Sequence, residues 1–238
     1  MLLATELRTL WQLARGSRAV DSHAARLEAF YAPQADDYDC FRERLLAGRA
    51  ELIAAMDIRA GQHVLELGAG TGRNAEFFAA VIPALAGLTL VDLCPALLAK
   101  ARARAAHWPN CAVVEADAIH FVAQGVDRLL LSYALSMMPA AEAVLSRAYA
   151  MLQPGALNGV VDFYVSDARP TCGLVRHGAL TRHGWRWWFG HDGVRLGSDT
   201  LTALRARFEQ VHLHEGRAAV PYLPGLRVPY FQFVGRRP

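Results

Sequence analysis

The chain has 238 residues, 53% of them hydrophobic, and a formal net charge of +3. This much apolar material can bury a full core in one domain and excludes a disordered chain. The mild basic excess falls short of a nucleic-acid-binding surface, so no nucleic acid partner is expected. The cysteines form no CxxC pair, which excludes a disulfide framework and a zinc knuckle and favours a reducing compartment.

Glu6 and Arg8 interrupt the N-terminus before an apolar core of signal-peptide length can build. The longest uncharged stretch, 77–91, contains Pro83 and Gly87 and is too short and too broken to span a bilayer. We therefore expect a cytoplasmic protein, with attachment to a membrane surface as the alternative.

Helical spacing dominates residues 1–58. Apolar residues share one face over 2–15, a second helix begins behind Asp21 or Ser22, and a third covers about 37–56. These helices predict an N-terminal lid.

From residue 62 to about 165, short apolar runs alternate with Ala-rich stretches. The runs are "HVLEL", "LTLVDL", "CAVVEAD", "RLLLSYA" and "NGVVDFYV". This alternation predicts an α/β fold with a mostly parallel sheet covered on both faces. A Gly-, Arg- and Trp-rich loop follows, then a helix near Ser198 and strands around "QVHLH" and "YFQFV". We expect a single domain over 1–238, with a lid (1–58), a ligand-binding core (59–166) and an acceptor-shaping C-terminal part (167–238).

The stretch "ELGAGTG" places a glycine turn between the first strand and the next helix, where a ligand can approach bare backbone amides. The dinucleotide pattern GxGxxG fails because Arg73 replaces its third glycine. E-x-G-x-G-x-G fits at every defined position, and the segment resembles the class I S-adenosylmethionine-dependent methyltransferases, which have a Rossmann-like seven-stranded sheet. A sharp turn without any ligand is the alternative. The residues expected here to bind the cofactor S-adenosylmethionine are Glu66, Gly68, Ala69, Gly70, Gly72 and Asn74.

Two acidic residues follow the next strands. Asp92 ends the second strand, where a carboxylate can accept hydrogen bonds from a ribose diol. Asp117 and Ala118 follow the third strand and resemble the family's adenine-binding positions. The alternatives are a solvated strand-end acid at Asp92 and a helix cap at Asp117. Leu93 and Ser132 complete the expected cofactor-binding set.

The acceptor of the methyl group is expected beyond the ends of strands four and five, where Tyr133, Asp162 and Tyr164 stand. Transfer from a sulfonium depends on alignment, so no catalytic triad is needed. The tyrosines offer aromatic faces to a growing ammonium, and Asp162 offers a charge. Plain packing, or helix capping by Asp162, is the alternative.

Four blocks together, "YDCFRERLLAGR", "ELGAGTGRN", "LSYALSMMP" and "VVDF", are similar to the N-methyltransferases of betaine-lipid synthesis, which trimethylate diacylglyceryl-homoserine. The resemblance implies that Tyr38 closes over the cofactor and that Arg49 pairs with its carboxylate; a buried tyrosine and a surface arginine are the alternative. It also implies a lipid headgroup as acceptor. A soluble small molecule, or a partner subunit without turnover, remains the alternative.

Three further expectations concern ligands and the backbone. The nine histidines lack carboxylates or cysteines in register, so no metal site is expected. Trp185, Trp187 and Trp188 stand among arginines, which suits peripheral membrane contact; plain core packing is the alternative. The stretch "LQPGALNGVV" departs from the family's usual sequence before the fifth strand, and Asn158 puts the local turn there in doubt.

Overall fold

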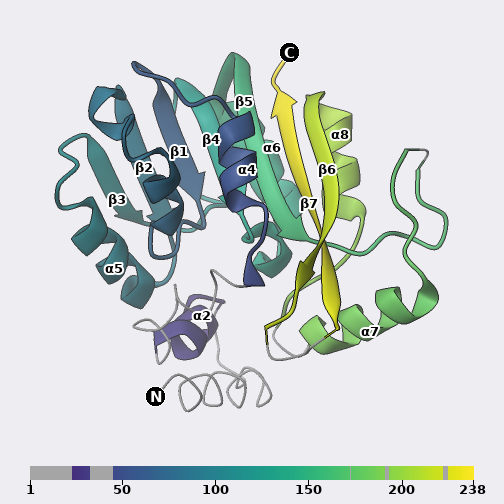
Figure 1. Ribbon diagram of the computed structural model, residues 1–238. Helices are drawn as coiled ribbons and strands as arrows, with labels where there is room; N and C mark the ends of the chain where they lie inside the picture. Colours follow the sequence, from purple (N-terminus) through teal and green to yellow (C-terminus); the bar gives the residue numbers. More distant parts are fainter. Residues whose placement is uncertain (1–22, 33–44, 172, 191–192, 222–224) are drawn as a thin grey trace.

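The computed structural model describes residues 23–32, 45–171, 173–190, 193–221 and 225–238 (Figure 1). The helix predicted over 2–15, the first part of the one predicted over about 37–56, and Tyr38 lie outside these residues. The described part of the third predicted helix contains α4 (Arg49–Ala55). The N-terminal lid and the threefold division of the chain therefore stay predictions.

A seven-stranded sheet forms the centre of the molecule, as predicted. Its order is β3-β2-β1-β4-β5-β7-β6, with β7 antiparallel to both of its neighbours and the other pairs parallel. The strands are β1 (His63–Leu67), β2 (Gly87–Asp92), β3 (Cys111–Glu115), β4 (Val126–Ser132), β5 (Leu152–Phe163), β6 (Glu209–Ala219) and β7 (Arg227–Arg236).

Helices cover both faces of the sheet (Figure 1). The described α-helices are α2 (His23–Tyr31), α4 (Arg49–Ala55), α5 (Pro95–Ala105), α6 (Ala141–Met151), α7 (Ala179–Gly190) and α8 (Asp199–Arg207). The described 3-10 helices are η2 (Arg73–Phe78), η3 (Ile82–Ala84) and η4 (Leu135–Met137). None of the helices within the described residues is long and apolar enough to cross a lipid bilayer.

One sequence expectation about local structure is wrong. The Trp-rich stretch predicted as a loop forms α7, because Trp185 and Phe189, one helical turn apart, pack one face of a helix against the core. Asn158, which put the local turn in doubt, is not in a turn. It lies within β5, paired with Leu129 on one side and Gly235 on the other.

The strand order places a crevice at the centre of the sheet. β1 is hydrogen-bonded to β2 on one side and to β4 on the other, so the chain leaves β1 and β4 in opposite directions. In open α/β sheets, ligands bind outside the carboxyl ends of the strands at such a point. Figure 1 shows α2 beyond these strand ends, and α2 packs against α5.

Candidate functional site

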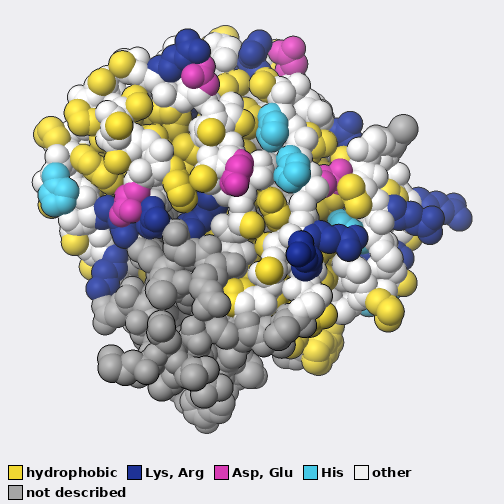
Figure 2. Space-filling view, viewed as in Figure 1, with side chains coloured by type: hydrophobic (Ala, Val, Ile, Leu, Met, Phe, Trp, Pro, Cys, Tyr) yellow, Lys and Arg dark blue, Asp and Glu magenta, His cyan; other side chains and the backbone are white. Residues whose placement is uncertain are grey.

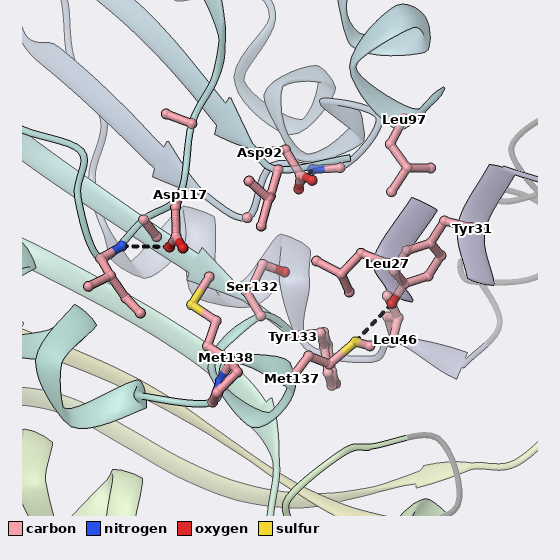
Figure 3. A pocket seen from close by; sticks show the side chains of 18 residues that line it. Leu27, Tyr31, Leu46, Asp92, Leu97, Asp117, Ser132, Tyr133, Met137 and Met138 are labelled. Atoms are coloured by element: carbon pink, nitrogen blue, oxygen red, sulfur yellow. Dashed lines mark hydrogen bonds between the residues drawn. The ribbon is translucent and has the colours of Figure 1, made fainter. Parts of the chain in front are cut away.

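A cavity of about 240 Å³ opens at the carboxyl ends of β1, β2, β3 and β4 (Figure 3). Its walls are mostly apolar, with two carboxylates, Asp92 and Asp117. Seven of the residues predicted to bind the cofactor line it: Gly68, Gly70, Asp92, Leu93, Asp117, Ala118 and Ser132. Tyr133, predicted for the acceptor side, also lines it.

The glycine turn is built by backbone geometry that other residues rarely adopt. Gly68, Gly70 and Gly72 have φ values of 72°, 55° and 70°. A Cβ on Gly68 would lie 2.6 Å from the Cβ of Ala134, the residue that follows β4 by two positions. The first glycine is thus required both for its conformation and for the close approach of the β4 end.

Asp92 ties this turn to the end of β2. Its Oδ2 accepts a hydrogen bond from the amide of Gly70 at 2.7 Å, and its Oδ1 accepts one from the amide of Cys94 at 2.9 Å. Burial raises the pKa of the Asp92 carboxyl. Each carboxylate oxygen keeps a further lone pair, and Asp92 faces the cavity, so it can still accept from a ligand hydroxyl.

Glu66, Asn74 and Arg49 form a buried chain that does not line the cavity. Asn74 donates from Nδ2 to Oε1 of Glu66 at 2.6 Å, and Arg49 donates to Oδ1 of Asn74 at 3.4 Å. Burial raises the pKa of Glu66 to about 8. Its Oε2 has no hydrogen-bond partner among the described residues. Arg49, expected at the cofactor carboxylate, instead meets Asn74 and the Leu46 carbonyl.

Asp117 lies on the cavity wall and also organises its own turn. Its Oδ1 accepts from the Ile119 amide at 2.9 Å, and its carbonyl accepts from the amides of His120 and Phe121. The helix cap named as the alternative is not present, because no helix lies between β3 and β4, a stretch that the structure describes throughout; Asp117 closes a turn and also faces the cavity. Ser132, on the opposite wall, has a buried hydroxyl with no partner among the described residues.

Tyr133 separates the cavity from the C-terminal part of the chain. Its hydroxyl donates to the carbonyl of Ala47 at 2.6 Å, and burial raises its pKa well above the ordinary value. Its ring lies 4.5 Å from that of Phe163, centroid to centroid. Tyr133 has a φ of 53°, a strained conformation for an aromatic residue. With its proton donated to Ala47, the phenol oxygen can only accept from a ligand.

Asp162 and Tyr164 are not among the residues that line the cavity. Asp162 is 2% exposed and accepts from the Ser136 amide (2.8 Å), the Ser136 hydroxyl (2.6 Å) and the Phe163 amide (2.8 Å). Burial raises its pKa to about 6. Tyr164 is buried against Phe231 and donates its hydroxyl to Glu215. The structure thus brings Asp162 beneath the η4 turn and Tyr164 into the core.

Several cavity residues were missed from the sequence. Leu27 and Tyr31 reach it from α2, and the Tyr31 hydroxyl donates to Sδ of Met137 at 2.8 Å. Glu28 caps the start of α5: its Oε2 accepts from the Cys94 thiol and the Ala96 amide. An apolar helical pattern does not distinguish residues that line a cavity from residues that face the core. Of the missed residues, the two methionines within "SYALSMMP" stand in a stretch that was singled out from the sequence.

Residues 64–155 match the protein family described as a methyltransferase domain. This stretch begins in β1 and ends in β5, so it contains the glycine turn, Asp92, Asp117 and Tyr133.

Relatives and solved structures agree with this match. Trans-aconitate 2-methyltransferase of Paracidovorax citrulli is 30% identical over 56% of the chain and 49% of its own length. Carboxy-S-adenosyl-L-methionine synthase of Chromohalobacter salexigens is 34% identical over 46% of the chain and 43% of its own length. The chain thus spans about half the length of these curated relatives. Phosphoethanolamine N-methyltransferase 2 of Haemonchus contortus, solved with S-adenosyl-L-methionine, shares the fold: the TM-score is 0.71 at 15% identity, over 92% of this chain and 61% of the other.

The cavity suits the cofactor that these matches support, S-adenosylmethionine. At Gly68 and Gly70 the cavity wall is bare main chain, which a ligand can approach closely, and a Cβ at Gly68 would collide with Ala134. Asp92 and the unpaired Ser132 hydroxyl supply polar partners between apolar walls. Among the described residues, no group of three His, Cys, Asp or Glu side chains could hold a metal ion.

Proposed function

We propose that the protein is an S-adenosylmethionine-dependent methyltransferase that methylates the nitrogen of an amino-acid-like headgroup, such as that of diacylglyceryl-homoserine. The observation that carries this proposal is the pairing of Asp92 with the glycine turn on one side of the cavity and Tyr133 on the other. The carboxylate side suits a nucleoside, and the aromatic side suits an acceptor that gains positive charge.

On the cofactor side, Asp92 accepts from the ribose diol while its other contacts hold the turn. Asp117 and the Ala118 amide contact the adenine, and the backbone of Gly68 and Gly70 lies under the amino-acid arm. The buried chain of Glu66 and Asn74 supports the turn from outside the cavity. Tyr38 and Arg49 remain proposed contacts of the cofactor carboxylate, Arg49 through a change from its present partners.

On the acceptor side, the protein contributes alignment and exclusion of water. The cofactor supplies an electrophilic methyl group, so the acceptor needs a free lone pair and correct orientation. An amine with a pKa near the α-amino reference of about 8 loses its proton readily at neutral pH. The phenol oxygen of Tyr133 can accept from its N–H, and the ring can stabilise the resulting ammonium. Asp162 supports this wall through the η4 turn that it holds at Ser136, and Tyr164 packs in the core behind it.

A soluble acceptor is the second candidate, because the trans-aconitate methyltransferase to which the chain is similar acts on a small molecule by its name. Incubation with labelled S-adenosylmethionine and either a membrane lipid extract or a soluble metabolite extract separates the two. A labelled product that partitions into chloroform and gains methyl masses supports the proposal. Label only in the aqueous phase would reject the lipid, and no product from either extract would indicate a subunit without turnover. Cytoplasmic location remains part of the proposal.

A further inference from the structure

The helix α7 divides its tryptophans between the core and the surface. Trp185 is buried, and its Nε1 donates to the Arg227 carbonyl at 3.2 Å. Phe189, one turn later, stacks near Trp185 and lies 5.2 Å from Phe163, centroid to centroid. This face therefore continues the aromatic packing that starts at Tyr133 on the cavity wall. Core packing accounts for one side of the helix only.

The opposite face of α7 is exposed and carries two large apolar side chains, with His183 between them. Leu180 is 91% exposed and Trp187 is 68% exposed; seven residues apart, they lie on the same side of the helix. Trp188 flanks them, also exposed. A single exposed apolar residue needs no explanation, but a large aromatic and a leucine on one helix face indicate an interaction surface.

Arginines outnumber acidic residues in the stretch around this face, although Arg186 lies 4.0 Å from the Asp167 carboxylate. The stretch 168–195 contains five arginines, 169, 176, 182, 186 and 195, against one acidic residue, Asp192. Figure 2 shows apolar side chains at the lower right, where Figure 1 places α7, and Lys and Arg side chains on the neighbouring surface above them. A helix with an apolar stripe, tryptophan and flanking arginines matches the interfacial helices that lie in the headgroup region of anionic bilayers.

The position of α7 links this face to the cavity. Figure 1 shows α7 on the side of the sheet toward which β1, β2 and β4 run. Beyond the helix, the chain returns to the cavity rim: the Arg195 amide donates to the Ser136 carbonyl at 2.7 Å, and its guanidinium donates to the Pro139 carbonyl at 3.1 Å. A surface that holds α7 would thus lie near the cavity wall formed by Met138 and Pro139.

We propose that the outer face of α7, formed by Leu180, Trp187 and Trp188, docks on an anionic lipid surface. The apolar side chains enter the headgroup boundary, and the arginines approach lipid phosphates. The proposal deepens the proposed function, since docking brings lipid headgroups to the cavity rim, and to that extent rests on it. Lipid binding is measured without turnover, so the docking proposal and the proposed function can each fail independently of the other.

The test is co-sedimentation of the full chain with vesicles of phosphatidylcholine alone or mixed with phosphatidylglycerol. The wild type should pellet with the anionic vesicles at low salt and lose most of this binding at high salt. The double variant Leu180→Ser/Trp187→Ser should bind at least about tenfold more weakly. The matched control is Val122→Ser, an apolar residue 62% exposed on the loop after β3, which should bind as the wild type does.

Two outcomes would overturn the proposal: a wild type that stays in solution with anionic vesicles, or a double variant that pellets as the wild type does. Loss of self-association in the double variant without any vesicle binding would also overturn it, in favour of a protein partner. Circular dichroism and the affinity for S-adenosylmethionine should be unchanged in the double variant, which excludes misfolding. A wild type that binds vesicles but not S-adenosylmethionine would reject the proposed function and leave the lipid surface standing.

Discussion

The amide of Gly70 donates a hydrogen bond of 2.7 Å to the carboxylate of Asp92, so the acid that ends β2 also holds the glycine turn that follows β1. The second oxygen of Asp92 holds the Cys94 amide at the start of α5. A ligand contact at Asp92 is therefore coupled to the shape of two neighbouring loops. Removing this side chain should affect the turn and the proposed ribose contact together.

Asp92→Ala should weaken binding of S-adenosylmethionine by at least tenfold. The substitution leaves two backbone amides without their acceptor, at about 1 to 3 kcal/mol each where they remain buried, and removes the proposed diol contact. Titration calorimetry measures the affinity. Glu115→Ala is the control, since Glu115 is the exposed carboxylate paired in register with Asp92 at the end of β3. Equal affinities for Asp92→Ala and the wild type would show that the ribose assignment is wrong.

Gly68→Ala should be more damaging than Gly61→Ala, although both glycines have a positive φ, 72° and 79°. Both variants carry backbone strain of about 1 kcal/mol. Only at Gly68 does the new Cβ meet a neighbour, Ala134 at 2.6 Å, whereas none lies within 4 Å at Gly61. The loss of unfolding free energy and of cofactor affinity in Gly68→Ala beyond that in Gly61→Ala measures the effect of the contact with Ala134. Equal losses in the two variants would contradict it.

Glu66 should make the protein less stable as the pH rises. Its pKa is raised to about 8 when folded, from an ordinary 4.5, so the folded state holds a proton that the unfolded state has lost. The Glu66 contribution to stability falls between about pH 4.5 and pH 8, by about 1 kcal/mol per pH unit, and is constant outside that window. Asp162, with a pKa raised to about 6, adds a similar slope over the lower part of the window.

Glu66→Gln removes the titrating group and should flatten this dependence. Urea unfolding of the wild type and of the variant is compared at about pH 5.5 and about pH 8.5. The first pH lies between the unfolded and folded pKa values of Glu66, and the second lies above both. The gap in unfolding free energy should move in favour of Gln at the higher pH. A gap that does not change with pH would mean that Glu66 is ionised in the folded protein.

Asp162→Asn should keep most of the turnover, because its single amide oxygen can still accept from one of the two backbone amides, Ser136 or Phe163, that Asp162 now holds. Asp162→Ala should lower the unfolding free energy by about 3 kcal/mol and raise the acceptor KM, since buried donors of Ser136 and Phe163 lose their acceptor. Steady-state kinetics and thermal unfolding of both variants distinguish the roles. A collapse of kcat in Asp162→Asn with unchanged stability would instead indicate contact with the acceptor.

Glu28→Gln and Glu28→Ala test whether α2 holds the cavity closed. Glu28 accepts from the Cys94 thiol and the Ala96 amide, and so caps a helix that has no capping side chain of its own. The alanine variant should release bound S-adenosylmethionine several-fold faster, measured by stopped-flow displacement, and the glutamine variant less so. Unchanged release in the alanine variant would show that α2 does not control access.

Much of the fold was predictable because it depends on local patterns. Alternating apolar runs and Ala-rich stretches indicated the parallel strands, and the seven-stranded sheet is confirmed. The glycine turn was predictable for a similar reason: a conformation with positive φ at Gly68, Gly70 and Gly72 requires glycine, so the backbone requirement is written in the residue type. Asp92 and Asp117 were found by their distance from that turn along consecutive strand ends.

The roles of individual side chains were less predictable. Asp162 and Tyr164 end the same strand that was expected to face the acceptor, yet both are buried and bonded to Ser136 and Glu215. The strand pattern predicts the face of the sheet on which a residue lies, but not which neighbouring residue it contacts. The exposure of Trp187 in α7 was not predictable for the same reason. The sequence does not distinguish Trp187 from Trp185, and only the packing of the helix leaves Trp187 exposed and Trp185 buried.

By itself, the sequence determined that a glycine turn follows the first strand of an α/β sheet and that carboxylates stand at the next strand ends. These are short-range requirements of backbone geometry and strand periodicity. Only the tertiary structure decided that Tyr133 donates its proton to Ala47, that α2 covers the cavity, and that Leu180 and Trp187 face outward. Such contacts join residues far apart in the chain, and they depend on how helices and strands pack in three dimensions.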